Sequence, residues 1–513
     1  MATVSDVPDE PGQPPALTAL SLAEISQESK TKEQVITPFD VSGGVDEHGK
    51  AVAIDYDKLI DHFGSQRIDK SMLERFERLT GKPPHRLLRR GLVFSHRDLN
   101  LILDKYEKGI PFFLYTGRGP SSGSMHVGHS VPFEFTKFVG TPSTCTQRVT
   151  ANKSNRRYLQ DAFNVPLIIM LTDDEKFLHS PKLSLKDCRK FALENALDII
   201  AIGFDPAKTF IFADTEFIYG GHGAAFGYNI LEIGKKTTNN QIKGTFGFND
   251  TYVVFFWHTT HYDVNWSVTY QVNSNNILEF AFPATQSATS FATSFPFIFG
   301  SNTKIVSKIP CLIPCAIDQD PYFRQCRDNA PRLGLVKPAL IHTVFLPSLR
   351  GSESKMSASD TESSIYLSDT DNQIKKKIGK AFSGGQDTRE LQEQIGGRTA
   401  VDVPFQYLTF FLESDEDLES MRERYEKGQM QSGEMKAAAT KELQAYVAAF
   451  RERRKAVTTE IRDEFMRPRQ LVFKSMPPEK EQVAMLEERR KVLQKELASI
   501  DGDLERLQRS GQA

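Results

Sequence analysis

Two histidines in a glycine-rich segment are the first residues whose spacing suggests chemistry. A strand-like run at 112–115 leads into residues 116–125, which are rich in glycine and serine, and then to His126 and His129. Such a turn lets the backbone approach a phosphate, and the start of a helix favours negative charge. Histidines three apart share one helix face, from which both can donate hydrogen bonds to phosphate oxygens. The segment therefore favours a nucleotide site, while a structural histidine pair or half of a metal site stay open as alternatives.

Other well-known sites fit this segment less well. It has no Gly-Lys-Ser/Thr ending, as a Walker loop requires, and it lacks the third glycine of the dinucleotide fingerprint. A zinc protease is disfavoured because the required glutamate and third ligand are missing. Cys311 and Cys315 have no second cysteine pair. No protein-bound metal is therefore predicted.

A lysine in a loop of small residues forms the second chemical group. Residues 351–359 read GSESKMSAS, with the lysine at Lys355, and they follow a strand-like run at 340–345. A lysine on a mobile loop can neutralise the charge that develops on a leaving pyrophosphate. Alone the loop would be interpreted as a solvated turn, but together with the histidine segment it predicts ATP-dependent chemistry.

The pair resembles the HIGH and KMSKS signature sequences of class I aminoacyl-tRNA synthetases. Four stretches are more specifically similar to tryptophanyl-tRNA synthetases of the eukaryotic type: YTGRGPSS at 115–122, LTDDEK at 171–176, CLIPCAIDQDPYFR at 311–324 and KMSASD at 355–360. Apart from two interruptions, the resemblance extends from about residue 37 to about residue 473.

The resemblance implies a cytoplasmic ligase that activates L-tryptophan with ATP and transfers it to tRNA(Trp). Mg²⁺ would arrive as the ATP complex, because no dedicated protein cage for it is visible. The amino acid carboxylate attacks, so positioning and charge neutralisation supply most of the catalysis without a side-chain nucleophile. A homodimer is also implied. A tyrosyl-tRNA synthetase, and a catalytically silent relative that binds RNA or acts in signalling, remain alternatives.

The same resemblance assigns roles to individual residues. Those implied in catalysis are His126, His129, Lys355 and Ser357, and those in ATP binding are Gly117, Arg118, Gly128 and Met356. Those implied in tryptophan binding are Tyr115, Glu175, Gln286, Cys315, Gln319 and Phe323. A carboxylate and amides suit an ammonium and an indole N–H, and the rings can stack on indole. Met170 departs from the pattern, since a glutamine is expected there.

A basic cluster further along the chain could contact tRNA phosphates. It includes Arg451 and Arg454, with Arg453, Lys455, Arg467 and Arg469 nearby, and a solvated helix face is an equally good interpretation. By resemblance only, Asp387 is assigned to anticodon recognition.

The elements that must position these residues follow an α/β pattern. Apolar runs at 112–115, 165–171, 209–212 and 340–345 alternate with helical stretches such as 185–202. This alternation predicts a parallel sheet covered on both faces, with ligands at the carboxyl ends of its strands. We expect a Rossmann-type catalytic domain at 96–375, followed by an all-helical anticodon-binding domain at 376–475.

The flanking segments differ in composition. Residues 1–35 predict a disordered arm, and residues 36–95 a small appended region with a strand at 52–56 and helices at 59–63 and 72–79. Residues 476–513 predict a coiled-coil-like helix, because Leu486, Leu493, Ile500 and Leu507 recur every seven residues. This helix could pair across subunits or fold back on its own chain.

The bulk composition limits the class of protein. A chain of 513 residues with 39% hydrophobic and 25% charged residues predicts a folded enzyme of several domains. Five sparse cysteines favour reduced thiols, and neither a targeting peptide nor an apolar run of about 20 residues is visible. The net charge of −2 disfavours a uniformly basic RNA-binding surface.

Two blocks interrupt the family pattern. Residues 139–157 split a helix that would otherwise continue, and residues 252–271 contain both tryptophans, Trp257 and Trp266. We consider one or both to be translated introns, with surface loops particular to a lineage as a nearly equal alternative. If the first block is translated, it lies close enough to displace His126 and His129.

Overall fold

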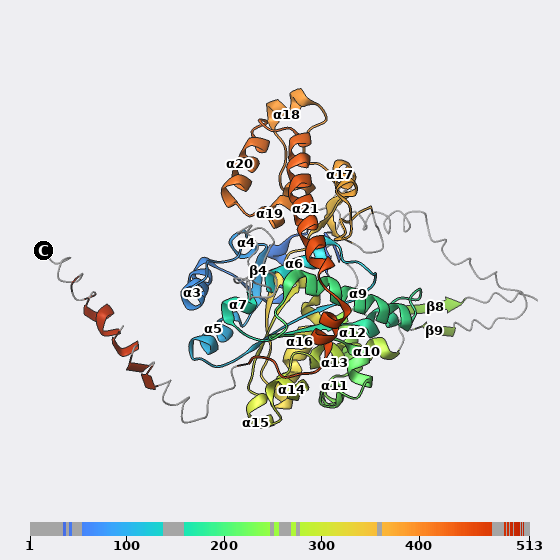
Figure 1. Cartoon of the computed structure of the whole chain (residues 1–513), viewed down its shortest axis with the longest axis vertical. Helices are drawn as coiled ribbons and strands as arrows, with labels where there is room; N and C mark the ends of the chain where they lie inside the picture. Colours follow the sequence, from blue (N-terminus) through green and yellow to red (C-terminus); the bar gives the residue numbers. More distant parts are fainter. Residues whose placement is uncertain are drawn as a thin grey trace, which may run out of the picture.

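The computed structural model describes most of the chain. It covers residues 34–36, 41–43, 54–136, 159–246, 251–255, 268–272, 277–356 and 362–473, and separate residues between 487 and 506. A central sheet carries helices on both faces, and a column of helices stands beyond one end (Figure 1). In this part of the chain no helix has the length and hydropathy needed for a membrane span.

The central sheet has seven strands in the order β3-β4-β11-β10-β5-β6-β7. Their bounds are β3 Gln66–Arg67, β4 Val93–Arg97, β5 Phe113–Arg118, β6 Leu167–Leu171, β7 Thr209–Ala213, β10 Cys311–Ala316 and β11 Ala339–Thr343. Strands β11, β10, β5, β6 and β7 pair in parallel, whereas β3 and β4 add an antiparallel edge. The predicted parallel α/β sheet is therefore confirmed.

Successive residues of each central strand enter two different cores. Leu114, Ile169 and Ile211 pack on one face, while Phe113, Ile168 and Phe210 pack on the other. Residues of a strand point alternately to opposite faces, so a strand covered on both sides must be apolar throughout. This explains the uninterrupted apolar sequences of β6 and β7, which are buried along their whole length.

Helices between the strands cover both faces. They include α5 Leu99–Glu107, α6 Val127–Thr136, α7 Leu159–Phe163, α8 Asp173–His179, α9 Leu185–Gly203, α10 Asp214–Tyr219, α11 Ala224–Lys236, α12 Asn239–Phe246, α13 Ile277–Ala288, α14 Pro296–Phe299, α15 Thr303–Val306 and α16 Asp320–Asn329. Helix α9 begins at a capping box in which the Ser184 hydroxyl accepts the N–H of Asp187 at 3.2 Å. The helix predicted at 185–202 is confirmed.

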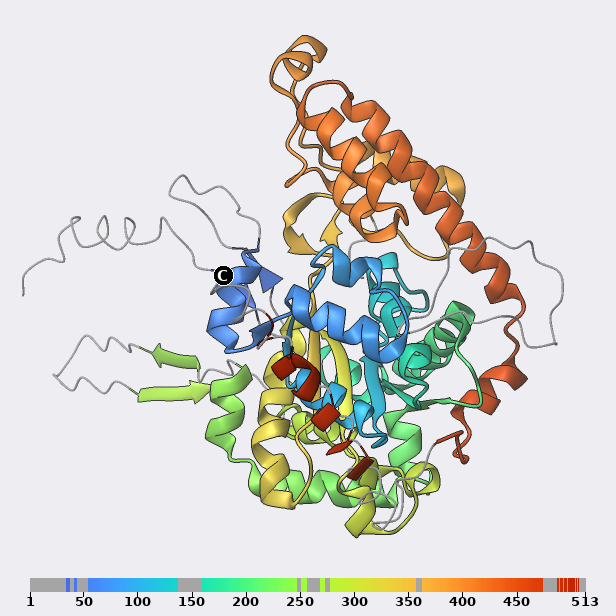
Figure 2. The ribbon, with the colours of Figure 1, turned by 90° about the vertical axis from the view of Figure 1, so that its left-hand side faces the viewer.

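The helical column contains α17 Asp371–Lys380, α18 Arg389–Ile395, α19 Val403–Phe411, α20 Asp415–Glu426, α21 Ser432–Lys455 and α22 Thr459–Met466. Helix α21 runs from the far end of the column to the sheet-covering helices (Figure 2). At the base of the column Arg90 donates to the carbonyls of Thr409 and Leu412 and to Asp415, at 2.6–2.8 Å. The predicted helical region is confirmed, and its domain boundaries remain a prediction.

A small second sheet joins the appended N-terminal region to the lysine loop. Its strands are β1 Val35–Ile36, β2 Val41–Ser42, β12 Pro347–Ser348 and β13 Gly351–Lys355, in the order β1-β2-β13-β12. Ser42 pairs with Ser354, one residue before Lys355. The backbone that leads into the lysine loop is thus a sheet strand rather than a free turn.

Helices follow in the appended region: α2 Tyr56–Phe63, α3 Lys70–Thr80 and α4 Arg86–Arg89. The first two confirm the helices predicted at 59–63 and 72–79. The strand predicted at 52–56 is wrong at its end, because Tyr56 begins α2. The Asp55 carboxylate caps this helix by accepting the N–H groups of Asp57 and Lys58, each at 3.1 Å. Residues 1–33 and 51–53 lie outside the described residues.

The residues described between 487 and 506 are helical. Leu493, Leu497, Ile500 and Leu504 are about half exposed there.

The structure describes the flanks of both interrupting blocks and the two ends of the second block. Residues 139–157 are outside the described residues, but α6 and α7 on either side meet in one core, where Phe135 and Leu159 are buried. In the second block β8 Thr251–Phe255 and β9 Val268–Val272 pair only with each other (Figure 1). The flanking helices α12 and α13 both contact Tyr322, through Phe246 at 4.5 Å and Phe282 at 5.8 Å between ring centroids.

Deleting residues 139–157 and 252–271 together should raise the soluble yield of the protein. The described helices on both sides of each block already pack in a common core, so we expect them to fold together without the intervening residues. Soluble yield from matched expression cultures measures the effect. An equal or lower yield would contradict the interpretation of the blocks as translated introns, as would messenger RNA that retains both.

Candidate active site

One cavity of about 420 Å³ opens at the carboxyl ends of β5, β6, β10 and β11. Twelve of the residues predicted from the sequence line it: Tyr115, Gly117, Arg118, His126, Gly128, His129, Glu175, Gln286, Cys315, Gln319, Phe323 and Met356. Lys355 ends β13 directly before Met356, but its side chain and the whole of Ser357 lie outside the described residues. Residues from five separated parts of the sequence thus meet in one place.

The two histidines of the glycine-rich segment lie face to face. Their rings stack with centroids 3.4 Å apart, as expected for positions on one face of a helix start. Neither ring nitrogen of the buried His126 has a hydrogen-bond partner within the described part of the chain. Burial, assisted by Arg118, lowers the pKa of His126 to about 3. At neutral pH this ring is uncharged, so one of its two nitrogens can donate a hydrogen bond and the other can accept one.

Arg118 brings a positive charge to the same wall. Its Nη1 donates to the Gly119 carbonyl, whereas the buried Nε and Nη2 have no partner among the described residues. Burial lowers the pKa of Arg118 to about 10, so the guanidinium stays charged at neutral pH. A buried cation with unused donors is costly unless an anion pairs with it. The arrangement suits a phosphate group.

Two glycines of this wall lie very close to side chains on the opposite side of the cavity. A Cβ at Gly119 would lie 2.1 Å from Cε of Lys176 and 2.9 Å from Oε2 of Glu175. At Gly128 it would lie 3.1 Å from the sulfur of Met356. Glycine at these positions lets the nucleotide-facing turn pack directly against the opposite side of the cavity.

The other end of the cavity is aromatic and amide-rich. The rings of Tyr115 and Phe323 meet edge to face with centroids 5.8 Å apart, and Gln286 Nε2 donates to Gln319 Oε1 at 3.3 Å. Burial raises the pKa of Tyr115 well above its usual value, so its hydroxyl stays protonated. This end can hold a flat apolar ring and, beside it, a group that needs hydrogen bonds.

Met170, the departure from the family pattern, is buried behind Tyr115. The Tyr115 hydroxyl donates to the Met170 sulfur at 3.5 Å, and the Thr289 hydroxyl lies 3.0 Å from the same sulfur. The thioether therefore accepts the hydrogen bond of the tyrosine hydroxyl, so a lone pair of the tyrosine oxygen can accept a hydrogen bond from a ligand.

Glu175 is one of the two acidic residues that line the cavity, with Asp318. Its Oε2 accepts from the Thr172 hydroxyl at 2.8 Å, and its Oε1 from Lys176 Nζ at 2.9 Å. Burial would raise the pKa of Glu175, but the Lys176 ammonium and the Thr172 hydroxyl hold it below its usual value. The carboxylate is therefore ionised and suited to bind an ammonium group.

A buried carboxyl group supports the turn that carries Glu175. Asp214, at the end of β7, accepts the N–H groups of Asp173, Asp174 and Thr215 at 2.9–3.3 Å. Burial raises the pKa of Asp174 to about 6, and burial together with Asp174 raises the pKa of Asp214 well above its usual value. The two carboxyl groups thus retain protons that free aspartic acids would lose.

A second buried network supports Gln319. Asp320 follows it and accepts from Arg97 Nε and Nη2 at 2.7 and 2.9 Å, while His342 Nε2 lies 3.0 Å away. Ser95 Oγ lies 2.9 Å from His342 Nδ1, which completes a serine, histidine and aspartate series. All three side chains are fully buried and none lines the cavity. This series is structural rather than hydrolytic.

Sequence reasoning missed several residues that line the cavity. Thr172, Lys176 and Asp318 are the polar ones that matter most, together with Gly119. Each lies inside a stretch that carries the family resemblance, so closer attention to those stretches could have found them.

The residues predicted to contact tRNA lie elsewhere and make different contacts. Asp387 is exposed in the segment between α17 and α18. Arg454 Nε lies 2.9 Å from Asp198 of α9, and Arg451 Nη1 donates to the Asp369 carbonyl at 3.0 Å. The other oxygen of Asp198 accepts the N–H of Met125 at 3.3 Å. These internal bonds favour a packing role for the two arginines.

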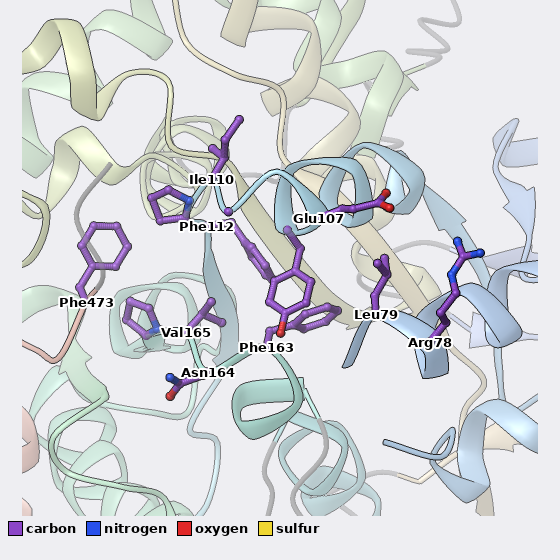
Figure 3. A pocket seen from close by; sticks show the side chains of 13 residues that line it. Arg78, Leu79, Glu107, Ile110, Phe112, Phe163, Asn164, Val165 and Phe473 are labelled. Carbon is purple, nitrogen blue, oxygen red and sulfur yellow. The ribbon is translucent and has the colours of Figure 1, made fainter. Parts of the chain in front are cut away.

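A larger cavity, of about 640 Å³, lies at the amino ends of β5 and β6 (Figure 3). It is lined by Phe112, Phe163 and Phe473 among others, and by none of the residues predicted to bind ligands. The smaller cavity is the candidate site because its unpaired polar groups, rather than its size, call for a ligand.

Replacing Asp214→Asn should stabilise the protein increasingly as pH rises. Because the folded protein keeps protons on Asp174 and Asp214 that the unfolded chain releases, the wild type loses stability from about pH 4 to beyond pH 6. The amide retains the acceptor oxygen but removes the repulsion. Thermal unfolding of both proteins between pH 4.5 and 8 measures the difference in melting temperature. A difference that stays constant with pH would show that the pair does not share protons.

Comparison with known proteins agrees with this site. The family model described as tRNA synthetases class I (W and Y) matches residues 272–448, beginning just after the second interrupting block. The cytoplasmic tryptophan–tRNA ligase of Saccharomyces cerevisiae is 48% identical over 443 residues, covering 86% of this chain and 91% of the relative. The human cytoplasmic enzyme is 49% identical over 446 residues, covering 87% and 83%.

Solved structures show the same likeness. Tryptophanyl-tRNA synthetase from Encephalitozoon cuniculi bound to tryptophan has 40% identity and a TM-score of 0.65, covering 81% of this chain and 98% of that chain. Identity at this level over most of both chains identifies the family. The chain belongs to the tryptophan–tRNA ligases, within the class I aminoacyl-tRNA synthetases.

Proposed function

We propose that the protein activates L-tryptophan with ATP, forming tryptophanyl-adenylate and pyrophosphate, and then transfers the tryptophanyl group to tRNA(Trp). The observation that supports this most is the single cavity, in which a phosphate-suited wall faces an aromatic end with an ionised carboxylate. Relatives named as cytoplasmic tryptophan–tRNA ligases support the substrate and a cytoplasmic location.

ATP binds along the glycine-rich wall. His126, His129 and Arg118 hold the phosphates. All three line this wall, and nitrogens of His126 and Arg118 lack a hydrogen-bond partner among the described residues. Gly117 and Gly128 let the nucleotide approach the backbone, and Met356 closes the far side. Mg²⁺ enters with ATP, bound to the phosphate oxygens.

Tryptophan binds at the aromatic end. The indole lies against Tyr115 and Phe323, with Cys315 beside it, and its N–H donates to the Tyr115 oxygen. The α-ammonium binds the Glu175 carboxylate, with the amide oxygens of Gln286 and Gln319 as further acceptors. These contacts direct the substrate carboxylate toward the phosphate wall.

Adenylate formation then follows from positioning. A tryptophan carboxylate oxygen forms a bond to the α-phosphorus, and the bond from that phosphorus to the bridging oxygen breaks, so pyrophosphate leaves with the electron pair. Arg118, the histidines and, from the β13 loop, Lys355 and Ser357 stabilise the transition state. In the second step a terminal ribose hydroxyl of tRNA attacks the acyl carbon, and AMP leaves.

The helical column of α17 to α22 is the anticodon-binding part, with Asp387 at its exposed end. The matching family model covers tyrosine-specific as well as tryptophan-specific synthetases, whereas the relatives that match over most of the chain are named tryptophan–tRNA ligases. A catalytically silent relative is the alternative that an activity assay separates.

Tryptophan-dependent exchange between ATP and labelled pyrophosphate should be detected with the purified full-length chain. Tyrosine and phenylalanine, tested in parallel, should give no exchange, because the aromatic end offers the indole N–H an acceptor. Exchange with tyrosine alone would contradict the tryptophan assignment. Absence of any exchange, both here and after deletion of residues 139–157 and 252–271, would favour the silent alternative.

We also propose that the protein is a homodimer that pairs through α11. Tyr228 and Leu231, three apart on this helix, are 69% and 70% exposed, and Tyr219 on the preceding α10 is 84% exposed. Large apolar side chains are seldom left uncovered together unless a partner buries them. A second copy of the same face would do so with two-fold symmetry.

Replacing Leu231→Glu should convert the dimer to a monomer, because two carboxylates would be brought together in a desolvated contact. Light scattering coupled to size-exclusion chromatography measures the mass. The matched control is Leu101→Glu, at a leucine on α5 that is also more than half exposed and that should leave the dimer intact. If Leu231→Glu remains dimeric, the C-terminal helix is the better candidate for the interface.

A further inference from the structure

An internal ion pair occupies the carboxylate proposed to bind the tryptophan ammonium. Lys176 Nζ lies 2.9 Å from Glu175 Oε1, and both residues line the cavity. The Lys176 ammonium has the same charge and the same hydrogen-bonding capacity as the α-ammonium of an amino acid. The lysine therefore occupies the place that the proposed function gives to the substrate's charged group.

Lys176 also lies directly against the phosphate wall. A Cβ at Gly119 would come within 2.1 Å of its Cε and 3.0 Å of its Nζ. Gly119 is adjacent to Arg118, whose Nε and Nη2 have no partner among the described residues. The lysine thus lies between the tryptophan end and the ATP end of the cavity. A rotation about the bonds of its flexible side chain would move the ammonium from one end to the other.

Each oxygen of Glu175 already accepts one hydrogen bond, and the group carries a single negative charge. Thr172 donates to Oε2 and Lys176 to Oε1. Because the carboxylate is largely buried, two ammonium groups beside it would repel each other, so an incoming α-ammonium competes with Lys176 for the same charge. Once displaced, a lysine in this low-dielectric cavity needs another anion.

We propose that tryptophan displaces Lys176 from Glu175 and that the freed ammonium then binds the phosphates of ATP. This inference rests on the proposed function, because it uses Glu175 as the ammonium site. Lys176 thereby becomes a phosphate-binding residue only when the amino acid is present. The exchange makes the two substrates bind cooperatively, and linkage requires that each raises the affinity of the other by the same factor.

The mechanism differs from a purely structural role for Lys176 in one measurable respect. A lysine that only orients Glu175 would, when removed, weaken tryptophan binding equally with and without nucleotide. A lysine that competes with the substrate would, when removed, strengthen tryptophan binding in the absence of nucleotide and abolish the cooperativity.

The test is the affinity for tryptophan, measured by calorimetry with and without α,β-methylene-ATP and Mg²⁺. For the wild type we expect the analogue to tighten tryptophan binding by about fivefold or more. For Lys176→Met we expect tryptophan alone to bind about threefold or more tighter, with the effect of the analogue reduced to less than about twofold. The rate constant of pyrophosphate exchange should fall while the KM for tryptophan does not rise. Lys176→Arg, which keeps the charge, should retain the cooperativity.

The control is Lys182→Met, which removes an exposed lysine from the turn after α8 and should behave as the wild type. Cooperativity that persists in Lys176→Met, or its absence from a wild type that is active with tryptophan, would overturn the inference but not the proposed function. Failure of the wild type to bind tryptophan or catalyse exchange would instead remove the proposed function. If Lys176→Met is insoluble, Lys176→Gln provides the same comparison.

Discussion

Parallel pairing of β10, β5, β6 and β7 is the constraint on which the rest of the structure depends. It brings the ends of these strands to one edge, so that Arg118, Thr172 and Cys315 lie around one cavity although they are far apart in sequence. The apolar strands cannot satisfy polar groups within the sheet, and charge therefore gathers where the strands end. The charges at this edge separate the proposed phosphate site from the proposed ammonium site. The neutral His126 and the Arg118 guanidinium, two of whose nitrogens have no partner among the described residues, lie on one side, and the ionised Glu175 lies on the other.

The fold was predictable wherever burial on both faces determined the sequence. The all-apolar runs of β6 and β7 and the capped, periodic α9 could be identified because their environment permits little else. The strand expected at 52–56 is wrong at its end, where the capping group of Asp55 starts helix α2 at Tyr56. Local pattern is thus a weak guide at the start of short helices.

The site residues that belong to sequence motifs could be predicted from the sequence. The residues with which they form hydrogen bonds and ion pairs could not be predicted. The spacing of residues does not reveal that Lys176 pairs with Glu175. Nor does it reveal that Asp214, directly after β7, supports the turn after β6, because this contact depends on which strands are neighbours. The arginines of α21 show the same limit, because arginine binds carboxylates of its own chain as well as phosphates of RNA. Only the structure shows that Arg454 pairs with Asp198.

Asp198 links the helical column to the histidine segment of the sheet domain. One of its oxygens binds Arg454 of the helical column, and the other accepts the backbone N–H of Met125, directly before His126. Tyr446 of α21 adds a second tie, since its hydroxyl lies 2.7 Å from Ser130 Oγ and 3.1 Å from Glu134 of α6. Asp198 and Tyr446 therefore tie the helical column to the segment that carries His126. A displacement of α21 would strain these contacts and, through them, the phosphate wall.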